Sequence, residues 1–417
     1  MRFFLATGNA KSVSISLDQQ PLTALNVGNA SAYLQVTAGN HVFTFDFGSA
    51  GSHDQAVTVS AEKHYTVPIF ATTAGSGNFD SQWFDDDTLY APPGDAGVRY
   101  FQACQTIAAQ DVLFDLGAGP QPVVGGVSVN TAVDVGYVVA GTGTLEIGES
   151  PGSTPAMEGG ATLVAGQLYT AITWCGADVP VPTTTLLPPA LSTDAPTVYE
   201  ASGVRLLNAS DLAQVILTFD GATLASTTTA GAGTLSPEQD YRLLSPGVHA
   251  VHLWRDFAVQ GGVPQGNLAA ADQTFDFVAG HVYSIIIGGQ GEVDPLLPNT
   301  ILSETLDPAA VPAPKAVARL INYAAADQTD VAQLFFGNQT GIPLGTAAYK
   351  GDGGDQLFDT TTPNTLTLVL PTYTTPALTV PQLAFLPQTR YLAIATGTAT
   401  AVSFWVVGPH GQVAKVP

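Results

Sequence analysis

The chain has 417 residues, a formal net charge of −22 and a charged fraction of only 11%. Its length suits three or four domains of ordinary size. The acidic balance excludes nucleic acid as a partner, because a negative surface repels phosphate backbones, and no apolar stretch approaches the roughly 20 residues of a membrane span. The 43 glycines and 29 prolines favour strands joined by turns.

The first part of the chain shows four features in a fixed order. An arginine followed by apolar residues comes first, and an alternating segment, SVSISLD, then places its apolar side chains on one face. Next, an aromatic residue stands six positions before a glycine, which fits a turn residue with positive φ. Last, a tyrosine opens a second apolar strand. In chain order these features are Arg2, residues 12–18, Tyr33 with Gly39, and Tyr65.

The same features recur three more times, and the repeated tyrosines are 104 to 114 residues apart. Short strands with turns about every 8 to 12 residues are typical of an immunoglobulin-like sandwich. Each tyrosine is either a large strand residue or a tyrosine corner whose hydroxyl bonds back to the preceding turn. The later arginines are Arg99, Arg205 and Arg319; the alternating strands are 111–117, 214–221 and 331–337; the turn glycines are Gly141 and Gly247; the tyrosines are Tyr169, Tyr283 and Tyr391.

We therefore predict an all-β chain of four tandem immunoglobulin-like antiparallel β-sandwich domains. Three segments rich in Pro, Thr, Gly or Asp separate the domains, and their composition predicts extended, semi-rigid linkers like the string between beads. The predicted domains are 1–75, 97–178, 200–290 and 316–417, and the predicted linkers are 76–96 (acidic), 179–199 and 291–315.

Two cysteines make up the whole thiol inventory. Cys104 follows the first strand of the second unit, and Cys175 ends its last strand. Because the first and last strands of a sandwich often lie close together, we expect a disulfide that closes this domain. A loop of that size contributes about 4 kcal/mol in the chain-entropy model.

The repeated unit resembles a secreted bacterial and archaeal family known only as domain of unknown function 4397. The first unit carries the resemblance through Asn9-Ala10, SVSISLD, YLQVTAG and HYTV. The second unit departs from the pattern at Val135, which replaces the aromatic residue, and the fourth departs at Asn364 and at Leu386-Pro387. The resemblance implies a sandwich fold and an exported location. It implies no catalytic residues, since the family has no assigned role.

The first residues, MRFFL, run directly into patterned strand sequence without the features of a signal peptide. Either a signal has been removed from this chain or the protein is cytoplasmic. We expect the former, because the composition is typical of secreted or cell-surface proteins.

The acidic cluster in the first linker is the best candidate for a ligand. Flexible loops that offer several oxygens suit calcium, and calcium often stiffens junctions between extracellular domains. The alternative is a solvated acidic linker. The candidate carboxylates are Asp80, Asp85, Asp86 and Asp87, with Asp352 and Asp355 as a second, weaker pair.

Histidines and tryptophans provide two further candidates. A metal site from His41, His53 and His64 requires the fold to gather them, and otherwise they are turn or surface residues. An aromatic platform for sugars requires exposed tryptophans, although they occupy different positions in their units and core packing is the alternative. The tryptophans in question are Trp83, Trp254 and Trp405.

We find no nucleophile elbow, phosphate-binding loop or metalloprotease motif, and we do not expect an enzyme. The expected function is that of an extracellular structural or interaction protein: a cell-surface spacer, an adhesin-like element or a subunit of a surface assembly or filament. Its expected partners are other surface proteins or further copies that associate through strand edges. The alternative is a module that binds carbohydrate or another polymer, with calcium as its only candidate cofactor.

Overall fold

The computed structural model describes most of the chain. The residues outside the description are 74–76, 88–90, 150–155, 177–180, 191, 221–227, 232–233, 237–240, 261–262, 290–295, 298, 307–309, 326–330, 338–342, 362–363, 372–376, 399–400, 409–410 and 417. In the remainder, no helix has the length and hydropathy needed to cross a membrane.

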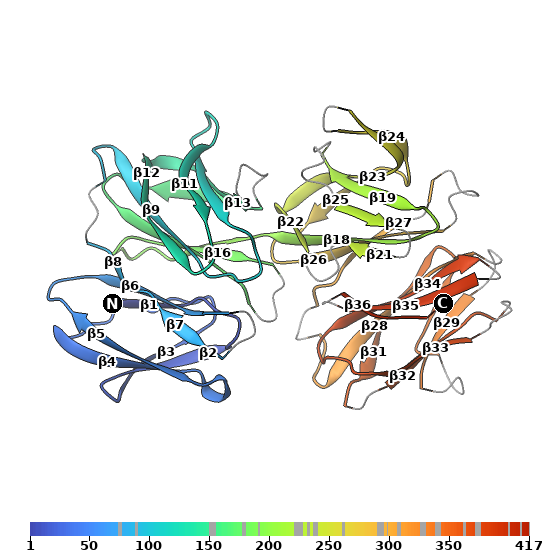
Figure 1. The fold of residues 1–417 in the computed structure, drawn as a ribbon, viewed down its shortest axis with the longest axis horizontal. Helices are drawn as coiled ribbons and strands as arrows, with labels where there is room; N and C mark the ends of the chain where they lie inside the picture. Colours follow the sequence, from blue (N-terminus) through green and yellow to red (C-terminus); the bar gives the residue numbers. More distant parts are fainter. Residues whose placement is uncertain are drawn as a thin grey trace. The chain divides into compact units, whose positions relative to one another are not determined.

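The prediction of an all-β chain of tandem sandwiches is confirmed (Figure 1). The first sandwich contains β1 (Arg2–Leu5), β2 (Ser12–Leu17), β3 (Gln20–Asn26), β4 (Gly39–Asp46), the 3-10 turn η1 (Gly48–Ala50), β5 (Ser52–Val59), β6 (Tyr65–Ala71), β7 (Phe79–Ser81) and β8 (Phe84–Asp85). The second contains β9 (Asp95–Gln102), β10 (Gln110–Asp115), β11 (Gln121–Val127), β12 (Thr131–Val139), β13 (Gly141–Glu149), β14 (Met157–Leu163), β15 (Leu168–Trp174), β16 (Thr183–Leu187) and β17 (Thr197–Glu200).

The third sandwich contains β18 (Ser202–Ser210), β19 (Gln214–Phe219), β20 (Thr228–Gly231), β21 (Thr234–Ser236), β22 (Arg242–Leu244), β23 (Gly247–Gln260), β24 (Val263–Leu268), β25 (Gln273–Phe277), β26 (Val282–Gly289) and β27 (Asn299–Ser303). The fourth contains β28 (Lys315–Ala325), β29 (Val331–Phe336), β30 (Gly345–Ala348), β31 (Gly351–Asp359), β32 (Asn364–Val369), β33 (Ala377–Leu383), β34 (Arg390–Thr398), β35 (Ala401–Gly408) and β36 (Gly411–Val416).

Each sandwich has two sheets. We call the sheet that carries the repeated arginine the arginine sheet, and the other the second sheet. The arginine sheets have the orders β1-β6-β7 with β8 on β6, β12-β9-β15-β16-β17, β21-β18-β26-β27 with β22 on β18, and β31-β28-β34-β35-β36. The second sheets have the orders β3-β2-β4-β5, β11-β10-β13-β14, β20-β19-β23-β24 with β25 on β23, and β30-β29-β32-β33.

The sheets are antiparallel, as predicted, apart from one parallel strand pair in each sandwich. In each sandwich the strand with the repeated arginine pairs in parallel with the strand that has the repeated tyrosine as its first or second residue. These pairs are β1 with β6, β9 with β15, β18 with β26 and β28 with β34. Between the two strands the chain builds the whole second sheet, and such a long crossover is what parallel pairing requires.

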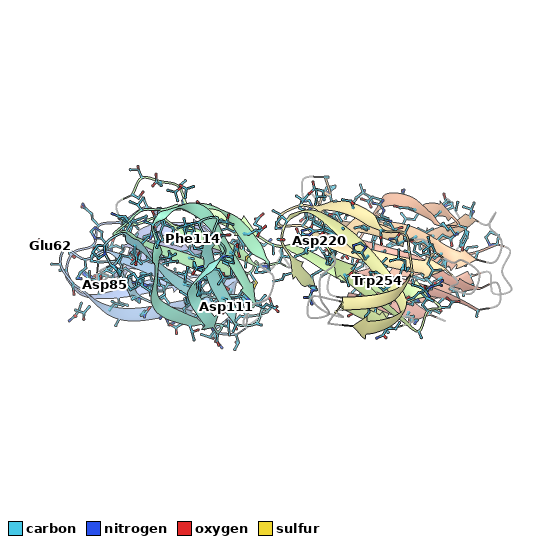
Figure 2. The ribbon with its side chains drawn as sticks, turned by 90° about the horizontal axis from the view of Figure 1, so that it is seen from above. Glu62, Asp85, Asp111, Phe114, Asp220 and Trp254 are labelled. Atoms are coloured by element: carbon cyan, nitrogen blue, oxygen red, sulfur yellow. A yellow bond between two sulfur atoms is a disulfide. The ribbon has the colours of Figure 1, made fainter. Side chains whose placement is uncertain are left out.

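The alternating segments behave as their pattern predicts. Val13 and Ile15 of β2 are buried while Ser12 and Ser14 are exposed, and in β10 the buried residues are Gln110, Val112 and Phe114. Phe114 is labelled in Figure 2 and is fully buried in the second sandwich. One face of each second sheet therefore supplies its sandwich core.

The chain divides into two compact units, each described here by itself. Unit 1 is Met1–Ser202 with the short segments Leu243–Pro246 and Val278–Gly280, and thus holds the first two sandwiches. Unit 2 is Gly203–Arg242, Gly247–Phe277 and His281–Pro417, and holds the last two.

Within each unit, the two sandwiches share a second apolar cluster that we call the interface cluster. Strand β1 is buried on both faces: Phe3 points into the core of its own sandwich, whereas Phe4 belongs to the interface cluster. The cluster of unit 1 comprises Phe4, Ala6, Phe70 and Phe84 from the first sandwich and Phe101, Ala103, Ile172 and Leu187 from the second. The cluster of unit 2 comprises Leu207, Ala209, Leu235, Ile286 and Leu302 from the third sandwich and Ile321, Tyr323, Leu392, Ile394, Trp405 and Val407 from the fourth.

The interpretation of three extended linkers is wrong where these segments are described. Residues 76–96 contain β7 and β8, residues 179–199 contain β16 and the start of β17, and residues 291–315 contain β27. All of these strands pair within arginine sheets, because their β-branched and aromatic residues suit a half-buried pleat despite the flanking prolines. The sandwiches of one unit are consequently joined by packed strands.

Each second sheet has a proline in one of its edge strands. Pro21 lies in β3, Pro122 in β11, Pro264 in β24 and Pro381 in β33. Proline has no backbone N–H, and on an edge strand it limits pairing with a further strand.

Candidate functional site

The first repeated arginine lies at the boundary between the two sandwiches of unit 1. The side chain of Arg2 is only 5% exposed and donates to the Thr66 hydroxyl at 2.9 Å and to the carbonyl of Pro188, in the second sandwich, at 2.8 Å. Its guanidinium lies 4.8 Å from the ring centroid of Tyr33. Tyr33 and Thr66 both donate to Oδ2 of Asp86, at 2.8 and 2.7 Å. We call these five residues latch 1.

The third repeated arginine has the same surroundings in unit 2. Arg205 is 1% exposed, its Nε lies 2.8 Å from Oε1 of Glu304, and it donates to the carbonyl of Gly408, in the fourth sandwich, at 2.9 Å. Its guanidinium lies 5.0 Å from the ring of Tyr241, whose hydroxyl donates to Glu304 at 2.8 Å, and Ser284 also donates to Glu304. These five residues form latch 2.

Strand register shows that the odd-numbered sandwiches supply equivalent residues to the two latches. Arg2 pairs with Thr66 as Arg205 pairs with Ser284. Thr66 pairs with Phe84, two residues before Asp86, and Ser284 pairs with Leu302, two residues before Glu304. Tyr33 and Tyr241 each stand six residues before a turn glycine.

The acceptor carbonyls in the even-numbered sandwiches are equivalent too. In the second sandwich Thr170 pairs with Leu187, the residue before Pro188. In the fourth, Leu392 pairs with Val407, the residue before Gly408. Both carbonyls therefore lie at the end of the strand that pairs with the tyrosine strand: Pro188 directly follows β16, and Gly408 is the last residue of β35.

The arginines of the even-numbered sandwiches have different roles. Arg99 is buried and donates to Oδ1 of Asp86 at 3.0 Å, so latch 1 contains a second cation. Arg319 is 24% exposed and pairs with Asp352 and Asp355 of its own sandwich, outside latch 2. The two carboxylates predicted as a weaker cation site are thus partners of an arginine.

Burial sets the protonation of the latch tyrosines. Removal from water raises the pKa of both Tyr33 and Tyr241 well above the usual value, and the nearby carboxylates raise it further. Both phenols therefore stay protonated and act as donors to Asp86 and Glu304. Burial also lowers the pKa of Arg2, although a guanidinium remains charged at any physiological pH.

The repeated tyrosines of the even-numbered sandwiches act as tyrosine corners. The hydroxyl of Tyr169 accepts from the backbone N–H of Val164 at 3.1 Å, and that of Tyr391 accepts from Leu386 at 2.8 Å. Those of the odd-numbered sandwiches, Tyr65 and Tyr283, pack against aromatic side chains of their own sandwiches.

The turn glycines agree only partly with the prediction. Gly39 and Gly247 have positive φ, at 143° and 126°. Gly141 is not among the residues with positive φ, and it begins β13 beside the side chain of Leu116, which leaves little room for a Cβ.

The predicted disulfide is present. Cys104 and Cys175 are bonded with their Cα atoms 4.9 Å apart. They follow the same ends of β9 and β15, and the parallel pairing of these strands brings the two cysteines together.

These observations agree with the comparison to known families. Residues 1–113 match the family model described as "Domain of unknown function (DUF4397)". The match covers the first sandwich and continues into β10, so the resemblance drawn from the motifs is confirmed for that part of the chain. No curated protein matches. Among solved structures, the Bacillus anthracis TIE protein aligns at 8% identity over 91% of this chain and 67% of its own, with a TM-score of 0.16, too low to indicate a common fold.

The acidic cluster of the DUF4397-like region does not converge on one point. Each carboxylate has its own partner: Asp80 accepts from the Ser81 backbone, Asp85 pairs with Lys63, Asp86 lies in latch 1 and Asp87 pairs with His64. In the described part of the chain, no three His, Cys, Asp or Glu side chains gather in a way that could hold a metal ion. The calcium interpretation therefore has no geometric support there.

The three histidines of the first sandwich are not gathered either. His41 lies 2.7 Å from Asp18, His64 lies 2.8 Å from Asp87, and His53 stacks on Phe45. An equivalent surface pair occurs in the third sandwich, where His249 lies 2.5 Å from Asp220; Asp220 is labelled in Figure 2. The sequence signal for these pairs was the Asp that ends the alternating strand and the His two residues after the turn glycine.

The three tryptophans lie in different surroundings. Trp83 packs on Phe43 in the first core, with ring centroids 5.0 Å apart. Trp254, labelled in Figure 2, donates to Thr218 at 2.9 Å. Trp405 is 2% exposed and belongs to the interface cluster of unit 2.

Proposed function

We propose that this chain is a non-enzymatic structural protein of the cell surface or extracellular space, a spacer built of paired sandwiches. The observation that carries the proposal is that the repeated residues form contacts between strands and between sandwiches. Arginines and tyrosines that recur through the chain hold strands and sandwiches together, in the two latches and the tyrosine corners. The polar side chains that recur through the chain thus have structural roles.

The compartment in this proposal is supported by the disulfide. Cys104 and Cys175 are bonded in the second sandwich, and bonds of this kind persist in oxidising surroundings outside the cytosol. The charged fraction of 11% is well below the roughly 25% of a typical soluble domain, which suits a chain with few surface helices.

The partners in this proposal are other surface proteins, contacted by a single copy of the chain. The prolines in the edge strands of the second sheets favour a single copy over strand-by-strand assembly.

The proposal is tested by three measurements on the full chain. In cells that produce it, we expect protease added from outside to digest it and the Cys104–Cys175 bond to be present in material trapped before lysis. The solution mass should stay at 42.9 kDa over a wide range of concentration. An array of glycans should show no saturable binding.

Other results would replace the proposal. A protease-resistant, reduced protein inside the cell contradicts the location. A defined oligomer or filament would make the chain an assembly subunit. Saturable glycan binding would make it a binding module, and the residues lost from binding on substitution would locate the site.

A further inference from the structure

The two latches occupy equivalent positions although they lie 203 residues apart, as the difference between Arg205 and Arg2 gives (205 − 2). Five components recur: a first-strand arginine, a tyrosine over it, a hydroxyl beside it, a carboxylate after the closing strand, and a carbonyl from the next sandwich. Chance would not place five components in the same register twice. When side-chain contacts are compared as well as sequence, the repeating unit of the chain is therefore a pair of sandwiches.

The two interface clusters show the same correspondence. Phe84 and Leu302 occupy one equivalent position, and Leu187 and Val407 occupy another, by the registers given above. Arg2 and Arg205 are 5% and 1% exposed, so each guanidinium is largely removed from water. A buried charge in such surroundings is stable only while its partners stay in place.

The surface that receives the next sandwich has defined requirements. The guanidinium of Arg2 or Arg205 needs a carbonyl oxygen from the incoming sandwich, and the surrounding cluster needs an apolar sheet face. The second and fourth sandwiches offer both, through Pro188 and Gly408 at the ends of the strands next to their tyrosine strands.

We infer that the arginine sheet of each odd-numbered sandwich is a docking surface for the sandwich that follows it in the same chain, and that the chain consists of two copies of one docked pair. This inference rests on the proposed structural function and names the partner of its sheets. The latch selects the partner, since an incoming sheet without a carbonyl at this point leaves a buried guanidinium short of an acceptor.

The test is hydrogen exchange, followed by mass spectrometry, on the full chain and two isosteric variants. Glu304→Gln removes the negative charge of latch 2 and leaves that of Arg205, and Asp86→Asn removes the negative charge of latch 1. For Glu304→Gln we expect exchange in β18, β34 and β35 to become about a hundredfold faster, the effect of breaking one buried ion pair. Strands β1, β9 and β15 should be unchanged, and Asp86→Asn should give the converse.

The matched control is Arg319→Gln, which removes the equivalent arginine of the fourth sandwich, a partly exposed residue outside latch 2. It should leave exchange in β18 and β26 unaltered. If Glu304→Gln perturbs the third sandwich alone and leaves β34 and β35 protected, the latch closes one sandwich and the docking inference is overturned.

A second variant covers the case in which Glu304→Gln fails to fold. Leu302→Ala keeps the latch and removes apolar contact from the interface cluster, and it too should speed exchange in β34 and β35. Protection that is unchanged in this variant also overturns the inference. A wild-type mass above 42.9 kDa that falls to that value in either variant would show that another copy occupies the surface. These outcomes differ from those of the location and glycan tests, so either proposal can fail alone.

Discussion

The indole ring of Trp174, in the second sandwich, occupies the space that a side chain on Gly28 of the first would need. A Cβ built on Gly28 would lie 2.3 Å from Cζ2 of the ring, and the glycine itself has a φ of 76°. The ring also donates through Nε1 to Thr185 at 3.2 Å, so it is fixed in place. The two sandwiches of unit 1 therefore approach each other as closely as backbone and ring allow.

Gly28→Ala should destabilise unit 1, because the new methyl group has to displace Trp174 from its position. The matched control is Gly166→Ala, since Gly166 has nearly the same φ, 75°, with nothing within 4 Å of its Cβ position. We expect both variants to lose about 1 kcal/mol from the left-handed backbone and Gly28→Ala to lose about 1–3 kcal/mol more from overpacking. Urea unfolding measures the difference, and equal losses would show that the close approach has no energetic weight.

The double variant Cys104→Ser/Cys175→Ser should lose about 4 kcal/mol of stability, because the bridge closes a loop over a sequence separation of 71. Guanidinium unfolding measures the loss, and hydrogen exchange should locate it in β9 and β15. A variant as stable as the oxidised protein would show that the parallel strand pair alone holds these ends together.

The Asp18–His41 pair should stabilise the first sandwich more in mild acid than at alkaline pH. The hydrogen bond that the His41 ring donates to the Asp18 carboxylate raises the pKa of His41 above its ordinary 6.5, so its contribution is complete below pH 6.5 and is lost as the pH rises through the raised pKa. Hydrogen bonds from the Val42 backbone and from His41 lower the pKa of Asp18 below 3.8, so that contribution is lost only in stronger acid.

Unfolding of the wild type and of His41→Gln at a series of pH values tests this expectation. The difference between the two proteins should be largest near about pH 5.5 and shrink towards alkaline pH. A difference that does not change with pH would mean that the pair contributes through hydrogen bonding alone.

Tyr169→Phe removes the acceptor for the Val164 N–H, and Tyr391→Phe removes that for Leu386. Each should cost about 0.5–1 kcal/mol, since the ring still packs and only one hydrogen bond is lost. Thermal unfolding of each variant checks the prediction. No loss in either would show that water replaces the phenol at these turns.

Sequence patterns predicted what depends on one sandwich alone. Alternation in SVSISLD placed Val13 and Ile15 in the core, and the positions of Cys104 and Cys175 predicted the bridge. These features are local, or they join strands that any sandwich brings together. The positive φ of Gly39 and Gly247 was likewise predictable, because a turn imposes it.

The pairing of sandwiches was not predicted, because residues that bind a neighbouring sandwich look like core residues in a sequence. RFFLA does carry a signal: it lacks alternation, as is typical of a strand buried on both faces. Asp86 illustrates the same difficulty. Among four acidic neighbours, only the fold distinguishes the one that is buried against Arg99 from those at the surface.

The prolines of the edge strands have a consequence when many copies of the chain lie close together. At a high local concentration, copies of a β-rich protein collide often, and their exposed edge strands can pair and aggregate. In each of the four sandwiches, one edge strand of the second sheet contains a proline that limits such pairing, namely Pro21, Pro122, Pro264 or Pro381. At high concentration these edge strands should therefore pair less readily with strands of another copy.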